Sequence, residues 1–267
     1  MGDSISMDFP HSGNWTEAQT QLAFYFYCQT PFGQLHQRNP KVVELAAWIG
    51  RTPSALAMKC CNFASLDPAM AARGVSGLGN AGKLVQKVWD DFHSNWDLLA
   101  GQCEAYLAAL RDAQGLQVPE EAADIAAGED FTGEVRLALV AQRRKQSFFR
   151  QAVLSGYRNR CCITGISDAR LLVASHIVPW REDAKIRLHP GNGLCLSALH
   201  DRAFDQYLFA LSDDCRVLLS KQMRQTSDVF LRQTFWPIED KQIELPERFQ
   251  PELAFIRRHR EQMLIAE

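Results

Sequence analysis

The sequence has no long apolar run: none approaches the roughly 20 residues that a helix needs to cross a bilayer. Its first residues, MGDSISMDFPHSGNW, lack the basic start and the apolar core of a signal peptide. No internal repeat is found along the chain. We therefore expect a cytoplasmic protein that has no membrane among its partners.

Cys-x-x-Cys pairs are also missing, although the chain has 8 cysteines. Four of them form two neighbouring pairs, Cys60-Cys61 and Cys161-Cys162, and the other four show no regular spacing. The usual spacing of a zinc site is therefore absent. We expect reduced, mostly buried thiols.

The chain carries little net charge, −2 over 267 residues, which by itself argues against a nucleic-acid-binding protein. The total hides an asymmetry, because residues 1–133 have a net charge of −7 and residues 134–267 a net charge of +5. Between Arg136 and Arg187 there are 11 basic side chains against 3 acidic ones. A local basic field of this kind favours a polyanionic substrate.

The length and the changes of composition along the chain predict two domains. Segment 112–133 is acidic, rich in alanine and poor in large apolar residues, so we predict a linker there. The predicted domains are residues 1–111, which are helical and a candidate for DNA recognition, and residues 134–267. Spacing of apolar residues predicts helices at 15–27, 40–49, 53–63, 83–110 with a break near Ser94-Asn95, 141–157, 221–235 and 251–264, and a hairpin at 207–220.

Two of these predicted helices, 40–49 and 53–63, are joined by a short turn that contains Gly50, the outline of a helix-turn-helix. The second helix of such a pair can lie in the DNA major groove, which would place Arg51 and Lys59 beside phosphates or base edges. The alternative is a plain helical hairpin within a bundle. The acidic character of this half of the chain keeps that alternative open.

The predicted helix 141–157 is basic and amphipathic. Its apolar residues predict a buried face, while Arg143, Arg144 and Lys145 stay available to solvent. A run of charged residues of this kind usually forms only a solvent-exposed helix face. Because this one leads directly into the candidate site, we expect contacts with DNA phosphates.

Residues that carry chemistry gather between residues 171 and 205, in an apolar strand, a polar loop, a second short strand and a helix. In chain order the candidates are His176, Asn192, His200, Asp201 and Asp205. Asp201 and Asp205 are four residues apart on the predicted helix, so two carboxylates can grip one cation. A strand histidine across from such a pair can take a proton from water.

Three ordered blocks, CCITG, ASHIVPW and HPGNGLCLSALHDRAFDQYLFAL, resemble the HNH endonuclease superfamily. The resemblance is to the branch with a Ser/Ala-His-Ile strand and an Ala-Leu-His-Asp-Arg-Ala-Phe-Asp helix, and it covers about half of the chain. It implies a ββα-metal finger that hydrolyses DNA phosphodiester bonds with Mg²⁺, Mn²⁺, Ni²⁺ or Zn²⁺. The implied fold class is α+β and mostly helical: an N-terminal helical, helix-turn-helix-like domain followed by a C-terminal HNH nuclease domain.

The resemblance implies a role for each candidate residue. His176 would be the general base that activates water, and Asn192 would tie down the loop and so fix the strand that carries His176. The last histidine of the family name falls at His200 or, by helix register, at the place of Asp201. Asp205, one turn further on, would be a metal ligand.

One departure from the family bears on function. The residue before the base is commonly Asp or His and binds metal, but here it is Ser175, a poor ligand. Two hypotheses follow: a DNA endonuclease, as in restriction or defence, and a non-catalytic DNA-binding or regulatory protein with a decayed HNH module. An RNA or structure-specific nuclease would use the same site. The expected partners are DNA and, as one option, a second copy of the chain in a homodimer.

Overall fold

The structure is a computed structural model, and it describes residues 13–74, 82–115 and 133–266. Among these residues no helix is both long enough and apolar enough to cross a bilayer.

The chain divides into two compact units, Met1–Phe148 (unit 1) and Phe149–Glu267 (unit 2). Helix α7 (Gly133–Gly156) contributes residues to both units. Most of the predicted linker 112–133 lies outside the described residues, so the predicted domain boundaries stay a prediction.

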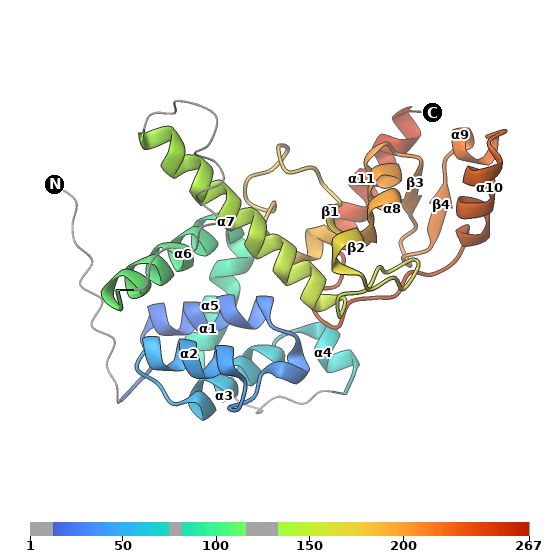
Figure 1. The fold of residues 1–267 in the computed structure, drawn as a ribbon. Coiled ribbons are helices and arrows are strands. Elements are labelled where there is room, and N and C mark those ends of the chain that lie inside the picture. Colours follow the sequence, from blue (N-terminus) through green and yellow to red (C-terminus); the bar gives the residue numbers. More distant parts are fainter. Residues whose placement is uncertain (1–12, 75–81, 116–132, 267) are drawn as a thin grey trace. The chain divides into compact units, whose positions relative to one another are not determined.

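The described part of unit 1 is helical (Figure 1). Besides the first part of α7, its elements are α1 (Glu17–Gln29), the 3-10 turn η1 (Phe32–Gln34), α2 (Pro40–Trp48), α3 (Pro53–Ala64), α4 (Pro68–Ala72), α5 (Lys83–Ser94) and α6 (Trp96–Ala113).

Helices of unit 1 begin where the sequence supplies cap residues. Thr16 starts α1 with a capping box, in which its side chain accepts from the N–H of Gln19. Asn39 and Thr52 cap α2 and α3, and each of these helices has proline in its first turn. Asn95 separates α5 from α6 and caps α6. The predicted helix pair and the predicted break near Asn95 are therefore both present.

Aromatic rings fill the core of unit 1 around Phe24, which is fully buried. Its ring centroid lies 4.7 Å from that of Phe63 in α3 and 4.8 Å from that of Phe92 in α5. The ring of Trp96, at the start of α6, is 5.7 Å away. One residue of α1 thus joins three other helices through ring contacts.

Unit 2 holds two small antiparallel strand pairs among short helices (Figure 1). After α7 its elements are η3 (Ala169–Leu171), β1 (Leu172–His176), η4 (Pro190–Asn192), β2 (Gly193–Ser197), α8 (Ala198–Asp205), β3 (Phe209–Leu211), β4 (Val217–Leu219), α9 (Lys221–Arg224), α10 (Val229–Phe235), η5 (Trp236–Ile238) and α11 (Leu253–Ala266).

Strands β1 and β2 pair with each other, and α8 packs against both. The register places Leu172 opposite Ser197 and His176 opposite Gly193. Ser197 ends β2 and caps α8, so the helix follows the strand without a loop. This order of two strands and a helix is the ββα arrangement that the sequence predicts.

The predicted hairpin at 207–220 is present as β3 and β4. The predicted continuous helix 221–235 is wrong, because α9 ends at Arg224 and α10 begins at Val229. Asp228 stands between them, and its side chain accepts from the N–H of Leu231 at 2.9 Å. A new cap therefore starts a new helix.

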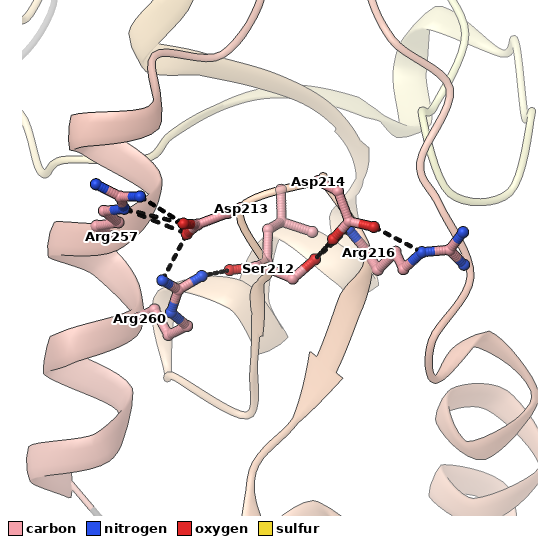
Figure 2. Close-up of polar contacts among 7 residues, drawn as sticks. Ser212, Asp213, Asp214, Arg216, Arg257 and Arg260 are labelled. Atoms are coloured by element: carbon pink, nitrogen blue, oxygen red, sulfur yellow. Dashed lines mark hydrogen bonds and ion pairs between the residues drawn. The ribbon is translucent and has the colours of Figure 1, made fainter.

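Helix α11 is fastened to the rest of unit 2 by neighbouring residues. Asp213, in the turn between β3 and β4, accepts from Arg257 at 2.6 Å and from Arg260 at 2.7 Å (Figure 2). Hydrogen bonds from these two arginines lower the pKa of Asp213 to about 2. The ring of His259 stacks on Phe204 of α8 with centroids 3.7 Å apart, and its Nε2 lies 3.1 Å from the Phe204 carbonyl oxygen. Helix α11 is therefore attached to both the hairpin turn and α8.

Candidate active site

His176 closes β1 and is held by three neighbours. Its Nε2 lies 2.9 Å from the carbonyl oxygen of Arg187, so this nitrogen carries the proton and donates it. The ring stacks on Phe149 with centroids 3.8 Å apart and planes at 10°, and Trp180 meets it edge-on at 5.6 Å. Burial lowers the pKa of His176 to about 4, against the opposing effect of the bond to Arg187. At neutral pH the ring is uncharged, and Nδ1 is the nitrogen that can accept a proton.

The stack of Phe149 on His176 depends on a glycine in the paired strand. Gly193 is the register partner of His176. A Cβ atom at Gly193 would lie 2.3 Å from Cγ2 of Val153 and 2.9 Å from Cζ of Phe149, both on α7. A residue without a side chain therefore lets α7 approach β2 closely enough for Phe149 to reach the imidazole.

Asn192 fastens the segment that follows His176. The Asn192 side chain is fully buried; its Oδ1 accepts from the N–H of Val178 at 2.8 Å, and its Nδ2 donates to the carbonyl oxygen of Val178 at 3.0 Å. The backbone carbonyl of Asn192 accepts from the N–H of Ile177 at 2.9 Å. These three bonds hold the backbone where it leaves β1, which is the geometry of a clamp behind His176.

Asp201 and Asp205 lie close to each other on α8. Burial raises the pKa of Asp201, while the Ser175 hydroxyl and the Arg202 guanidinium lower it in part. Burial and the negative charge of Asp201 raise the pKa of Asp205, and Arg202 again opposes the shift. The two carboxylates therefore repel each other with incomplete compensation, a situation that a bound cation relieves.

The structure does not bring His200 to this carboxylate pair. The His200 side chain is 3% exposed, and its ring lies 5.3 Å from that of Phe235 and 6.4 Å from that of Phe209. Its Nδ1 is 2.8 Å from Oγ of Ser197. Consecutive residues of a helix are rotated by about 100° about its axis. His200 therefore points into the core, whereas Asp201, the next residue, does not. Of the two alternatives that the sequence left open, Asp201 is the one beside Asp205.

Ser175 lies on β1, which packs against α8. The residue is 2% exposed, and a hydrogen bond from its hydroxyl lowers the pKa of Asp201. His176 follows Ser175 at the end of the strand, and its ring lies against Phe149 of α7.

The donor groups fit a divalent ion that keeps much of its own water. Among the described residues, no three side chains of His, Cys, Asp or Glu converge on one point. Mg²⁺ in proteins is commonly held by one or two carboxylates, with water and substrate phosphate completing its octahedron. Asp201 and Asp205, with their raised pKa values, supply such a pair.

Arg51 and Lys59, which the sequence predicts to contact DNA, interact with other residues of unit 1. Arg51 donates to the carbonyl oxygens of Gly13 at 2.8 Å and Asn14 at 2.7 Å. Arg51 and Lys59 both lie over the ring of Trp15, at 5.1 Å and 4.6 Å from its centroid. Burial and the charge of Arg51 lower the pKa of Lys59. The two cations are thus held by cation–π contact on one ring.

The three basic residues predicted on α7 differ in their surroundings. Lys145 forms an ion pair with Asp97 at 2.7 Å. Arg144 is half-buried and Arg143 is exposed. Of the five side chains predicted to contact DNA, Arg143 is the one that is exposed.

Two residues that shape the site were not identified from the sequence. Phe149 and Gly193 are not among the candidate residues that the sequence predicts. The sequence signal for Gly193 is the Gly-Asn-Gly tripeptide around Asn192. In the structure, a Cβ atom added at Gly191 or at Gly193 would lie within 3 Å of neighbouring atoms.

Strands β1 and β2 with α8 define a ββα module that carries His176, Asn192 and the carboxylate pair. The family model of the HNH endonucleases matches residues 161–212, which include every one of these elements. This segment belongs to the HNH endonuclease superfamily, as the sequence predicts. No curated protein matches the chain.

Proposed function

We propose that this protein is a metal-dependent DNA endonuclease that hydrolyses phosphodiester bonds. The observation that carries the proposal is the fixed, uncharged imidazole of His176. Nε2–H of His176 donates to the Arg187 carbonyl, and Phe149 stacks on the ring. The low pKa of His176 leaves Nδ1 unprotonated at neutral pH. A general base must be held in one tautomer and free to accept a proton, and His176 meets both conditions.

In the proposed reaction, Nδ1 of His176 takes a proton from the water that attacks the phosphorus atom. Asn192 keeps the backbone behind His176 in place through its bonds to Val178. The stack with Phe149 keeps the ring from rotating. The base is therefore oriented before substrate binds, which avoids reorganisation during the reaction.

Asp201 and Asp205 would hold the divalent ion. When bound, the ion supplies positive charge to the phosphate and to the leaving oxygen. His200 is left out of this ligand set, because its ring is buried between Phe209 and Phe235.

DNA is the proposed substrate because basic residues outnumber acidic ones by 11 to 3 between Arg136 and Arg187. Arg143 is proposed to contact phosphate, and the α2–α3 pair to select the DNA in a restriction or defence role. Contact by Arg51 would require release of its bonds to Gly13 and Asn14. Nothing in the described part of the chain supports the predicted homodimer, and the cytoplasmic location stays a prediction.

The test is plasmid cleavage by the purified full chain with Mg²⁺, Mn²⁺, Ni²⁺ or Zn²⁺, on both methylated and unmethylated DNA. Two variants of the base are compared. His176→Ala removes the ring, whereas His176→Phe keeps an aromatic ring to stack on Phe149 but has no nitrogen. We expect both to lose cleavage by a factor of about 100 or more, and His176→Phe to retain the wild-type melting temperature more closely.

Nicking that persists in His176→Phe would remove His176 from the role of base. Binding of DNA without cleavage under every metal would favour the alternative, a DNA-binding protein with a decayed HNH module. Cleavage of RNA in preference to DNA would keep the site and change the substrate.

A further inference from the structure

We infer that Lys59, which lies over the ring of Trp15, binds a backbone phosphate of DNA and so positions α3 on the duplex without reading its bases. The inference rests on the proposed function. It goes further by assigning one contact of unit 1 to a single ammonium group and by naming phosphate as the group that is bound.

The first support is the way in which Trp15 and Lys59 are held. Arg51, in the turn between α2 and α3, donates to the carbonyl oxygens of Gly13 at 2.8 Å and Asn14 at 2.7 Å. These two bonds fasten the backbone just before Trp15. The centroid of the Trp15 ring lies 4.6 Å from Nζ of Lys59 and 5.1 Å from Cζ of Arg51. The Lys59 ammonium is therefore oriented by a ring whose own backbone is tied to the turn.

The second support is positive charge that the described part of the chain does not neutralise. Lys59 is half-buried, and burial together with the charge of Arg51 lowers the pKa of Lys59. Within residues 13–74, 82–115 and 133–266, no carboxylate forms an ion pair with Lys59 or Arg51. Carboxylates are nevertheless common nearby in sequence, since residues 1–133 have a net charge of −7. Two neighbouring cations repel each other, and an anion from outside the protein relieves that repulsion.

The third support is the position of Lys59 beside an open helix face. Ser54 and Met58, four residues apart on α3, are both exposed to solvent. The three N–H donors of the Lys59 ammonium make no hydrogen bond to any described residue. When α3 enters the major groove, this ammonium can donate to a phosphate at the edge of the groove. Contacts to phosphate fix the position of a protein on the duplex and are the same for every base sequence.

The experiment measures DNA binding by the full chain as a function of salt, without divalent metal so that no cleavage occurs. Fluorescence anisotropy of several labelled duplexes of unrelated sequence gives the Kd at each salt concentration. Lys59→Met removes the charge and keeps an apolar stem to lie on Trp15, whereas Lys59→Arg keeps the charge. Lys83→Met is the matched control, because Lys83 is an exposed lysine of unit 1 outside the α2–α3 pair.

We expect Lys59→Met to reduce the slope of log Kd against log salt by about 0.9, the effect of losing one phosphate contact. The same slope predicts binding that is weaker by about tenfold at about 50 mM salt and by about fourfold at about 200 mM salt. The loss should be equal for every duplex. Lys59→Arg should keep the wild-type slope, and so should Lys83→Met. Circular dichroism checks that each variant is folded.

A wild-type slope in folded Lys59→Met would overturn the inference, and so would an equal reduction in Lys83→Met, which would mean a general effect of charge. A loss confined to one duplex would give Lys59 a base contact and overturn the assignment to phosphate. Absence of DNA binding by the wild type would also overturn it.

Plasmid cleavage separates these failures from a failure of the proposed function. Cleavage that requires His176, together with an unchanged slope in Lys59→Met, would leave the nuclease intact and remove only the phosphate contact. Conversely, DNA binding that depends on Lys59, without cleavage under any metal, would support the inference and count against the nuclease.

Discussion

The close approach of α7 to β2 can be tested with Gly193→Ala. The added Cβ would lie 2.3 Å from Cγ2 of Val153, 2.9 Å from Cζ of Phe149 and 3.3 Å from the carbonyl oxygen of Pro190. The Val153 and Phe149 side chains are each 2% exposed, so neither can turn into solvent to make room. We expect the free energy of unfolding to fall by about 3 kcal/mol, the upper end of the overpacking range, because helix and strand must separate.

Thermal unfolding of the full chain measures this loss. About 3 kcal/mol corresponds to a fall of roughly 10 °C in the Tm of a unit of about 120 residues. Gly33→Ala is the matched control, since an added Cβ there has no neighbour within 4 Å. Val153→Ala in the background of Gly193→Ala removes the shortest contact and should restore part of the stability, in a double-mutant cycle.

The same substitution should also lower DNA cleavage, because Phe149 can no longer stack on His176 in its present position. A free energy of unfolding of Gly193→Ala within about 0.5 kcal/mol of the wild type, the range of ordinary surface substitutions, would contradict the close contact of helix and strand. The absence of any recovery in the Val153→Ala background would likewise show that Val153 does not make the critical contact.

Three further predictions concern buried polar groups. Burial lowers the pKa of His176 and of His259 to about 4, from an ordinary value of 6.5. As the pH falls from 6.5 to about 4, these imidazoles take up protons in the unfolded chain before they do so in the folded chain. The free energy of unfolding should therefore decrease across this window, and the full stability should be present above it. Urea titrations at several pH values measure this decrease, and His259→Phe should make it smaller. The acid limb of kcat/KM should accordingly lie near pH 4, and a limb near pH 6.5 would contradict the buried state of the base. Asn192→Ala leaves the buried N–H and carbonyl of Val178 without their side-chain partner and should cost about 3 kcal/mol in urea unfolding. Asn192→Asp keeps the acceptor for the N–H but not the donor, and equal stability of the two variants would argue against the two-bond clamp.

Much of the fold could be predicted because local signals and core packing agree. Thr52 with Pro53 marks the start of α3, and Asn95 marks the break between α5 and α6. The ββα module was predictable from the order of its blocks, since Ser197 both ends a buried strand and caps the following helix. Each of these signals acts within a few residues of the chain.

The rest depended on contacts between segments that are distant in sequence. Whether His200 or Asp201 joins Asp205 is decided by the rotation of α8, which places His200 against Phe235. The role of Gly193 follows from where α7 crosses β2. The engagement of Arg51 follows from the backbone carbonyls of the chain that precedes α1. Apolar spacing carries no information on any of these.

The attachment of α11 has a consequence for how the HNH segment could be exchanged between proteins. The family match ends at residue 212, one position before Asp213, which binds Arg257 and Arg260. A recombination event that transferred only the matched segment would cut between β3 and β4 and remove the ring that covers Phe204 of α8. The segment that would have to be transferred is therefore longer than the segment that the family model matches. Helix α8, which carries Asp201 and Asp205, is covered by His259, which lies about 50 residues beyond the matched segment.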